Sequence, residues 1–183
     1  MRAGWLRLPL LTLFLTGLYG CGVAHVKTQV AAEDWQNYRS AYIKDVRVYS
    51  EEAAAVSNEA LQTKMAGWQA QSLRQITQFL ERSRLNLLPE PPAQPDNTLA
   101  VEIDTNVRYG NRALRYFVGF GAGKGTVNST LSVTDAESGE TKFQAESESS
   151  LSVGIGGGDM GRVLESNVEK LIEQLNTETE LNR

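Results

Sequence analysis

The chain has 183 residues and a formal net charge of −4, with 18 lysines and arginines against 22 aspartates and glutamates. This acidic balance argues against general nucleic-acid binding, which needs an overall basic field or a large basic face. With one cysteine and one histidine, the chain cannot form an intrachain disulfide, a thiolate metal site or a Cys-x-x-Cys redox pair.

The beginning of the chain has the pattern of an export signal. Arg2 and Arg7 precede an apolar run over residues 8–18. This run is too short to cross a bilayer as a stop-transfer helix, and small residues close it. It ends in Leu18-Tyr19-Gly20-Cys21, which resembles the lipobox of bacterial lipoproteins.

The lipobox resemblance implies a signal peptide over residues 1–20 and acylation of Cys21, for example with palmitate. Gly22 stands where an inner-membrane retention signal has aspartate, so we expect the outer membrane, with the domain facing the periplasm. Residues 21–40 show no sustained periodicity, and we expect a lipid anchor and tether there. The single histidine, His25, lies in this tether, so no Ser-His-Asp or Cys-His arrangement can be assembled on the folded domain.

Residues 41–178 are expected to form a single α+β domain that begins with a strand over residues 41–49. A long helix follows, because Ser57 or Asn58 can act as its N-cap and apolar residues then recur at spacings of three and four. Gly67 weakens this helix or marks close packing. The proline-rich segment 88–96 must end the helix and is expected as an extended connector.

The clearest strand pattern lies at residues 99–109, where apolar and polar residues alternate. The pattern returns at residues 127–133 and, after the turn sequence Asp135-Ala-Glu-Ser-Gly139, at residues 143–153. Asp159 can cap a final amphipathic helix. We therefore expect an antiparallel sheet of about four strands in the order β-α-β-β-β-α, with both helices on its apolar face.

Glu102 and Asp104 lie two residues apart on the polar face of the predicted strand. A carboxylate pair can perform acid–base chemistry, as in glycosidases. On a strand that alternates this cleanly, a solvated face is the simpler interpretation. No other catalytic or metal-ligating constellation is visible, so we expect a protein that is not an enzyme and that uses no cofactor or metal.

The segment between Asp104 and Asp135 contains no acidic residue and combines cations, aromatic rings and glycines. This composition suits contact with an anionic partner such as lipid headgroups, a charged glycan or an acidic protein surface. The alternative is that the aromatic rings pack in the core and the cations are ordinary solvated charges. The candidate contact residues are Arg108, Arg112, Arg115, Phe117, Phe120 and Lys124.

The stretch Tyr-Phe-Val-Gly-Phe-Gly-Ala-Gly-Lys-Gly over residues 116–125, together with the Asp135-Ala-Glu-Ser-Gly139 turn, resembles a known family. This is the uncharacterised bacterial lipoprotein family called domain of unknown function 4410. The resemblance covers about residues 40–175. It implies an exported lipoprotein with an α+β domain, and it assigns no catalytic residue because the family has no established activity.

These observations predict an outer-membrane-anchored lipoprotein that binds a partner in envelope assembly or transport, with residues 108–124 as the contact. The expected partner is an envelope protein or an anionic envelope ligand, besides the membrane itself through Cys21. The alternative is a module that binds a small ligand or glycan in a pocket between the sheet and the glycine-rich loops.

Overall fold

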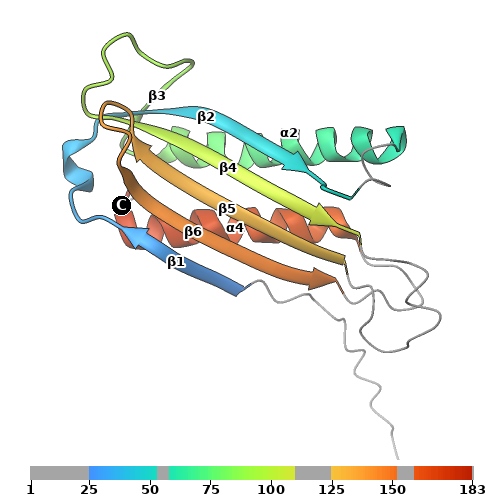
Figure 1. Cartoon of the computed structure of the whole chain (residues 1–183). Helices are drawn as coiled ribbons and strands as arrows, with labels where there is room; N and C mark the ends of the chain where they lie inside the picture. Colours follow the sequence, from blue (N-terminus) through green and yellow to red (C-terminus); the bar gives the residue numbers. More distant parts are fainter. Residues whose placement is uncertain (1–24, 53–57, 110–124, 152–158, 183) are drawn as a thin grey trace, which may run out of the picture.

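The computed structural model describes residues 25–52, 58–109, 125–151 and 159–182 (Figure 1). Within these ranges, no helix is long and apolar enough to cross a membrane. The elements in chain order are β1 (His25–Ala31), the 3-10 helix η1 (Trp35–Asn37), β2 (Ser40–Tyr49), α2 (Glu59–Arg82), β3 (Asn86–Leu88), β4 (Thr98–Arg108), β5 (Gly125–Asp135), β6 (Thr141–Leu151) and α4 (Met160–Thr179).

The strands of the described residues form one mixed, six-stranded sheet in the order β1-β6-β5-β4-β2-β3. Strands β4, β5 and β6 pair antiparallel, and β1 extends this part by pairing antiparallel with β6. Strand β2 pairs parallel with both β3 and β4. The chain leaves β2, passes through α2 and returns to the same end of the sheet, and such a crossover produces parallel neighbours.

The chain is α+β as expected, but the prediction of an antiparallel sheet of about four strands in the order β-α-β-β-β-α is wrong. Two of the six strands lack a clear sequence pattern. β1 comes from the segment expected to be a tether, and it is mostly exposed at the sheet edge, so its residues need not alternate in polarity. β3 has three residues and ends directly before Pro89. The parallel pairing of β2 depends on the crossover helix rather than on any local pattern.

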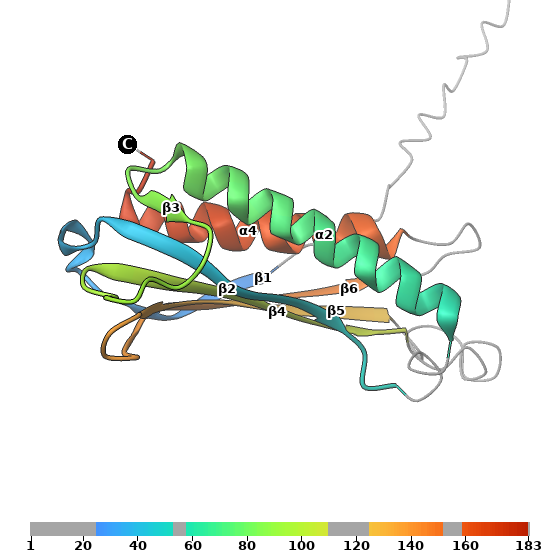
Figure 2. The ribbon, with the colours of Figure 1, turned by 90° about the horizontal axis from the view of Figure 1, so that it is seen from above.

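Both long helices lie on one face of the sheet, side by side (Figure 2). Asn58 caps α2 by accepting a hydrogen bond from the Leu61 N–H at 3.2 Å, and Asp159 caps α4 by accepting one from the Gly161 N–H at 2.9 Å. The predicted apolar stripes face the sheet. The buried apolar residues of the helices include Met65, Ile76, Phe79, Leu80, Val163, Leu164, Val168, Leu171 and Leu175.

The two faces of the sheet differ in polarity. The face under the helices buries Val101, Ile103, Val107, Val127, Leu131, Val133, Phe143 and Ala145. The other face is polar, and no described element covers it (Figure 2). On this open face Glu102 pairs with Lys44 at 3.0 Å and with Arg47 at 3.2 Å, and Asp104 also pairs with Arg47. The two carboxylates are thus neutralised by cations.

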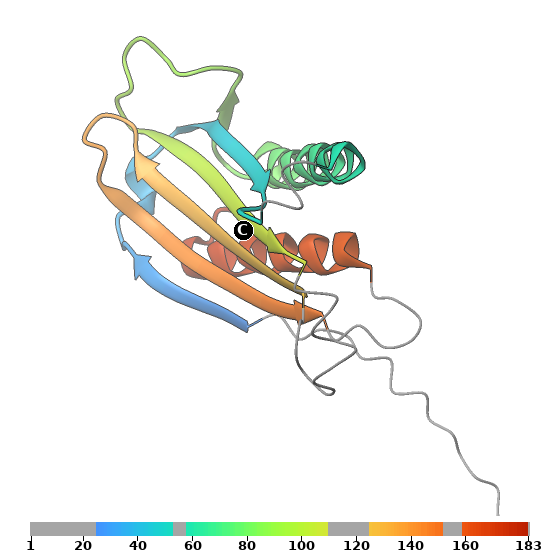
Figure 3. The same ribbon diagram turned by 45° about the vertical axis from the view of Figure 1, so that its right-hand side comes forward.

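The strands of the sheet run between two ends, which we call the turn end and the base end (Figure 3). At the turn end, β1 leads into η1, β4 begins, and residues 135–141 connect β5 to β6. At the base end, β1, β5 and both helices begin, and β4 ends. Strand β4 has 11 residues, so the two ends lie about 35 Å apart.

Candidate functional site

The contact predicted at residues 108–124 is described only at its first two residues, Arg108 and Tyr109. Arg108 ends β4 at the base end, where its guanidinium lies 3.3 Å from the Glu51 carboxylate. Its side chain is 55% exposed. The other predicted functional residues, Cys21, Arg112, Arg115, Phe117, Phe120 and Lys124, lie outside the described residues.

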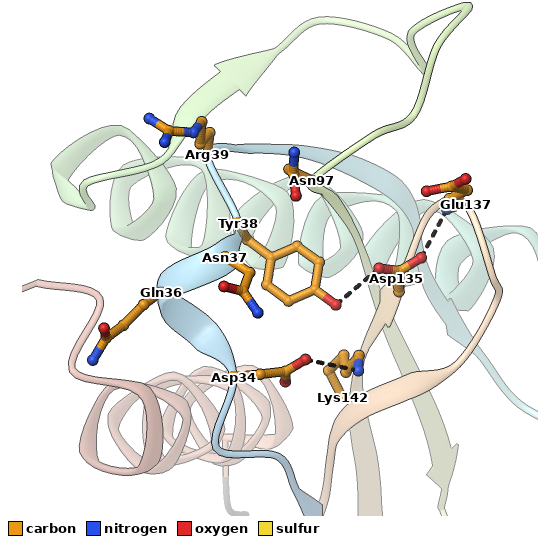
Figure 4. A pocket seen from close by; sticks show the side chains of 9 residues that line it. All are labelled: Asp34, Gln36, Asn37, Tyr38, Arg39, Asn97, Asp135, Glu137 and Lys142. Carbon is orange, nitrogen blue, oxygen red and sulfur yellow. Dashed lines mark hydrogen bonds and ion pairs between the residues drawn. The ribbon is translucent and has the colours of Figure 1, made fainter.

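A polar pocket opens at the turn end of the sheet (Figure 4). Its volume of about 480 Å³ falls within the usual range of ligand sites, roughly 300–1,000 Å³. Three segments that are far apart in the sequence meet there, around η1, before β4 and at the β5–β6 hairpin. The lining residues come from residues 34 and 36–39 around η1, Asn97 before β4, Asp135 and Glu137 at the β5–β6 turn, and Lys142 in β6.

Tyr38 and Asp135 join two walls of the pocket (Figure 4). The Tyr38 hydroxyl donates a hydrogen bond to Asp135 Oδ2 at 2.8 Å, and Tyr38 is only 4% exposed. Burial, together with this bond to the carboxylate, raises the pKa of Tyr38 to about 12. This tyrosine is therefore a neutral hydrogen-bond donor at neutral pH.

The other oxygen of Asp135 orders the turn. It accepts hydrogen bonds from the Ser138 N–H at 2.7 Å, the Ser138 hydroxyl at 2.9 Å and the Glu137 N–H at 3.0 Å. The bond from the Ser138 N–H is the main cause of a lowered pKa at Asp135. The predicted turn is present, and Gly139 closes it with a φ of 74°, a conformation that favours glycine. Asp135 is thus a fixed anion in the pocket wall.

Lys142 is a buried cation, 8% exposed, in the same pocket. Its Nζ lies 2.8 Å from Glu140 Oε2 and 3.1 Å from Asp34 Oδ2. The hydrogen bonds to Glu140 and Asp34 raise the pKa of Lys142 above its ordinary value, so the ammonium is charged at neutral pH. The second oxygen of Asp34, Oδ1, is buried and has no hydrogen-bond partner among the described residues.

Two residues fix the backbone of the pocket walls. The Arg84 guanidinium donates to the backbone oxygen of Tyr38 at 3.1 Å and also to that of Trp35. Asn97 has a φ of 53°, and its carbonyl oxygen accepts a hydrogen bond from the Arg39 N–H at 2.9 Å. Asparagine adopts this left-handed conformation more readily than most residues. The pocket is therefore held open by contacts within the protein itself.

The pocket does not follow from the sequence patterns, which place residues 34–39 in a tether and Asp135 in a turn. One signal points to it: Trp35 and Tyr38 lie close together, whereas unstructured segments are poor in aromatic residues. The alternative pocket, predicted between the sheet and the glycine-rich loops, involves loops that lie outside the described residues. In the part of the chain that is described, no group of three or more His, Cys, Asp and Glu side chains could hold a metal ion.

A protein-family model with the description "Domain of unknown function (DUF4410)" matches residues 28–154, which is more than half of the chain. The chain belongs to this family. The match confirms the resemblance found in the sequence, and every residue that lines the pocket lies within the part of the chain that matches DUF4410.

Among solved structures, this DUF4410 chain is similar to the PelC dodecamer from Paraburkholderia phytofirmans, with 13% identity and a TM-score of 0.47. That match covers 84% of this chain and 97% of the other. A second similar structure, from Helicobacter pylori, is described as a homologue of a neuraminyllactose-binding hemagglutinin, with 11% identity and a TM-score of 0.46. This second match covers 81% of the DUF4410 chain and 86% of the Helicobacter pylori chain. No curated protein matches the sequence.

Proposed function

We propose that this DUF4410 protein is an exported outer-membrane lipoprotein that binds a ligand without transforming it, and that the polar pocket is its binding site. The observation that carries the proposal is a preformed pocket of about 480 Å³ whose walls are fixed by the protein's own hydrogen bonds. Ligand pockets of this size are usually mostly apolar with a few converging polar groups, whereas this pocket is lined mainly by polar groups, which suits a polar ligand.

The titratable groups of the pocket favour binding over catalysis. A general acid or base works best when its pKa lies near the working pH. Here the pKa of Tyr38 is raised to about 12, the pKa of Lys142 is raised, and the pKa of Asp135 is lowered. Each of these shifts moves the group further from neutrality. The pocket thus offers fixed donors and acceptors rather than groups ready to exchange protons.

The proposed lipid anchor places the pocket away from the membrane. If Cys21 is acylated, three residues separate it from the first residue of β1, and these four residue steps span at most about 14 Å. The base end of the sheet then lies next to the membrane. The pocket at the turn end faces the periplasm, about one strand length further out, where a soluble ligand or a glycan can reach it.

We also propose residues 108–124 as a second contact surface, which binds an envelope protein or an anionic envelope ligand. Arg108 supports this assignment through its position, because it lies at the base end with most of its side chain exposed. Its ion pair with Glu51 offsets part of its charge, so the remaining cations of the segment would have to supply the attraction. This contact and the pocket are at opposite ends of the sheet and can be tested together.

The test is photo-crosslinking in cells, with the full-length protein expressed at its native level. A photoreactive residue replaces Gln36 at the pocket rim in one variant and Arg108 at the base end in a second. A third variant carries the probe at Gln78, an exposed position on α2 that lies in neither site, as the control. The adducts are identified by mass after the membrane fraction is isolated.

We expect a discrete adduct from Gln36 that Gln78 does not give, and the Asp34→Asn change should reduce it. An adduct from Arg108 alone would transfer the binding function to the base end. If none of the three probes gives an adduct in protein shown to be folded and acylated, the binding proposal is wrong.

A further inference from the structure

The chemistry of the pocket restricts the class of ligand that it can hold. We infer that it binds a neutral polyhydroxyl ligand, namely an uncharged sugar unit, rather than an anion or an apolar molecule. This inference rests on the proposed function of the pocket and adds the identity of the ligand class. It is carried by the charges and the hydrogen-bonding capacity of the described lining residues.

The charges in the pocket disfavour an anionic ligand. Three carboxylates line it, those of Asp34, Asp135 and Glu137, against two cations, Arg39 and Lys142. The charge of Lys142 is also shared with Glu140, which lies 2.8 Å from its Nζ. A phosphate or carboxylate placed beside the ammonium would therefore be repelled by more charges than attract it, because like charges that share one site repel each other.

The hydrogen-bonding groups match a hydroxyl. An ammonium has three N–H groups, and within the described residues Lys142 uses two of them, on Asp34 and Glu140. The Asp34 side chain is 41% exposed, and its Oδ2 can accept a second hydrogen bond besides that from Lys142. A hydroxyl is both donor and acceptor, so a single hydroxyl can accept from Lys142 and donate to Asp34 while their ion pair stays intact.

The rim of the pocket extends this pattern. The side chains of Asn37 and Asn97 are exposed amides, each with a donor and an acceptor, and both line the pocket (Figure 4). A ligand with several neighbouring hydroxyls can use these groups together with Lys142 and Asp34. A ligand with a single polar group would leave most of them to water.

The aromatic residues of the site limit the affinity. Tyr38 is the aromatic residue that lines the pocket, and it is only 4% exposed, so its ring presents no face on which a sugar could stack. A hydrogen bond between protein and ligand replaces hydrogen bonds that both groups made with water, so hydrogen bonds alone contribute little net binding free energy. We therefore expect a Kd of about 1 mM for a monosaccharide, and tighter binding for a longer glycan that also contacts the rim.

The experiment measures binding by saturation-transfer NMR and titration with the acylated full-length protein in a detergent without sugar groups. Glucose is the neutral probe, and glucuronic acid and glucose 6-phosphate are its anionic counterparts. Maltotriose distinguishes recognition of a glycan chain from that of a free sugar, and preference for either supports the inference. Asn97→Gly removes the rim amide but accepts the φ of 53°, and Glu173→Gln on the exposed side of α4 is the matched control.

We expect glucose to bind about tenfold more tightly than glucuronic acid. Asn97→Gly should weaken glucose binding about three- to tenfold, while Glu173→Gln leaves it unchanged. Asp34→Asn should weaken glucose binding and strengthen glucuronic acid binding, since it removes both an acceptor and a negative charge.

Tighter binding of the anionic sugars overturns the inference, as does an affinity for glucose that Asn97→Gly does not change. Failure of every sugar to bind also overturns it. The crosslinking from Gln36 then shows whether only the ligand class is wrong or the binding function of the pocket as well. If the probe at Gln36 forms an adduct with another kind of ligand, the pocket is a binding site and only the inferred ligand class is wrong. No sugar binding and no adduct together reject both.

Discussion

At the scale of single residues, Tyr38 links the segment after β1 to the turn after β5 through one buried hydrogen bond. Its partner Asp135 lies 97 positions away in the sequence and also orders the turn. Removing the Tyr38 hydroxyl would leave one oxygen of a partly buried carboxylate without a donor. Because unsatisfied polar groups are costly, this bond contributes to stability as well as to the shape of the pocket.

Tyr38→Phe should therefore lower the free energy of unfolding by about 1 kcal/mol at neutral pH. The pKa of Tyr38 rises from 10.0 to about 12 on folding, so the hydroxyl stabilises the fold fully below pH 10. That contribution is lost as the pH rises through about 12. We measure the free energy of unfolding of wild type and Tyr38→Phe with urea, from pH 9 to pH 12 in steps of roughly one pH unit. The difference between the two proteins should shrink over this range. A difference that does not vary with pH would contradict this assignment.

Single residues also show where sequence reasoning stops. The turn at Asp135 and Gly139 is predictable, because its residue types are those that a tight turn requires. The partners of Asp135 and Lys142 are not predictable, since Tyr38 and Asp34 come from a segment without a periodic pattern. A pocket that is assembled from three distant segments becomes visible only when the sheet order is known.

At the scale of elements, α4 is fixed to the sheet by a polar contact within an apolar interface. Asn167 is fully buried, donates to the backbone oxygens of Val127 at 3.0 Å and Ser147 at 3.3 Å, and accepts from the Ser149 hydroxyl at 2.6 Å. The helices and β4 to β6 are predictable because each buries one face and so alternates with a regular period. The buried Asn167 breaks that pattern, and only the structure shows why it is tolerated.

Two glycines in the helices provide a matched pair of substitutions. Gly67 in α2 has no atom within 4 Å of the position that a Cβ would take, so close packing does not explain it. A Cβ on Gly161 in α4 would lie 2.7 Å from Nε1 of Trp68, which is too close unless the indole shifts. Gly67→Ala should raise the free energy of unfolding by about 0.5–1 kcal/mol through helix propensity. Gly161→Ala should lower it, because repacking the Trp68 ring outweighs that gain.

Thermal and urea unfolding of the two variants beside the wild type checks this pair. Equal effects of the two substitutions would show that Trp68 does not hold the start of α4 against α2. A loss of stability in Gly67→Ala would show that the position meets a partner that the described residues do not include.

At the scale of the whole molecule, one of the two edges of the sheet carries features that oppose pairing with other chains. β1 forms this edge, and its register with β6 shifts between Thr28 and Val30, which marks a bulge. Lys27 adds a charge on the same strand. Bulges and lysines are common devices against edge-to-edge association. The proposed lipid anchor, by holding many copies on one membrane, would increase the need for such protection.

The orientation proposed for the anchored protein can be tested with its own tryptophans. Cleavage before Cys21 would remove Trp5 and leave Trp35 and Trp68. Trp35 belongs to η1 at the turn end, whereas Trp68 approaches Gly161 near the beginning of α4, closer to the base end. The two residues therefore report on different distances from the membrane.

The protein is placed in vesicles that contain dansyl-labelled lipid headgroups, and energy transfer from each tryptophan to dansyl is measured. Trp35→Phe reports on Trp68 alone, and Trp68→Phe reports on Trp35 alone. We expect stronger transfer from Trp68 than from Trp35, because anchoring through Cys21 brings the base end towards the headgroups. A longer linker inserted after residue 22 should reduce this difference, since it frees the domain to tumble. Equal transfer with the native spacing would mean that the sheet lies along the membrane, and stronger transfer from Trp35 would mean that the pocket faces the lipid.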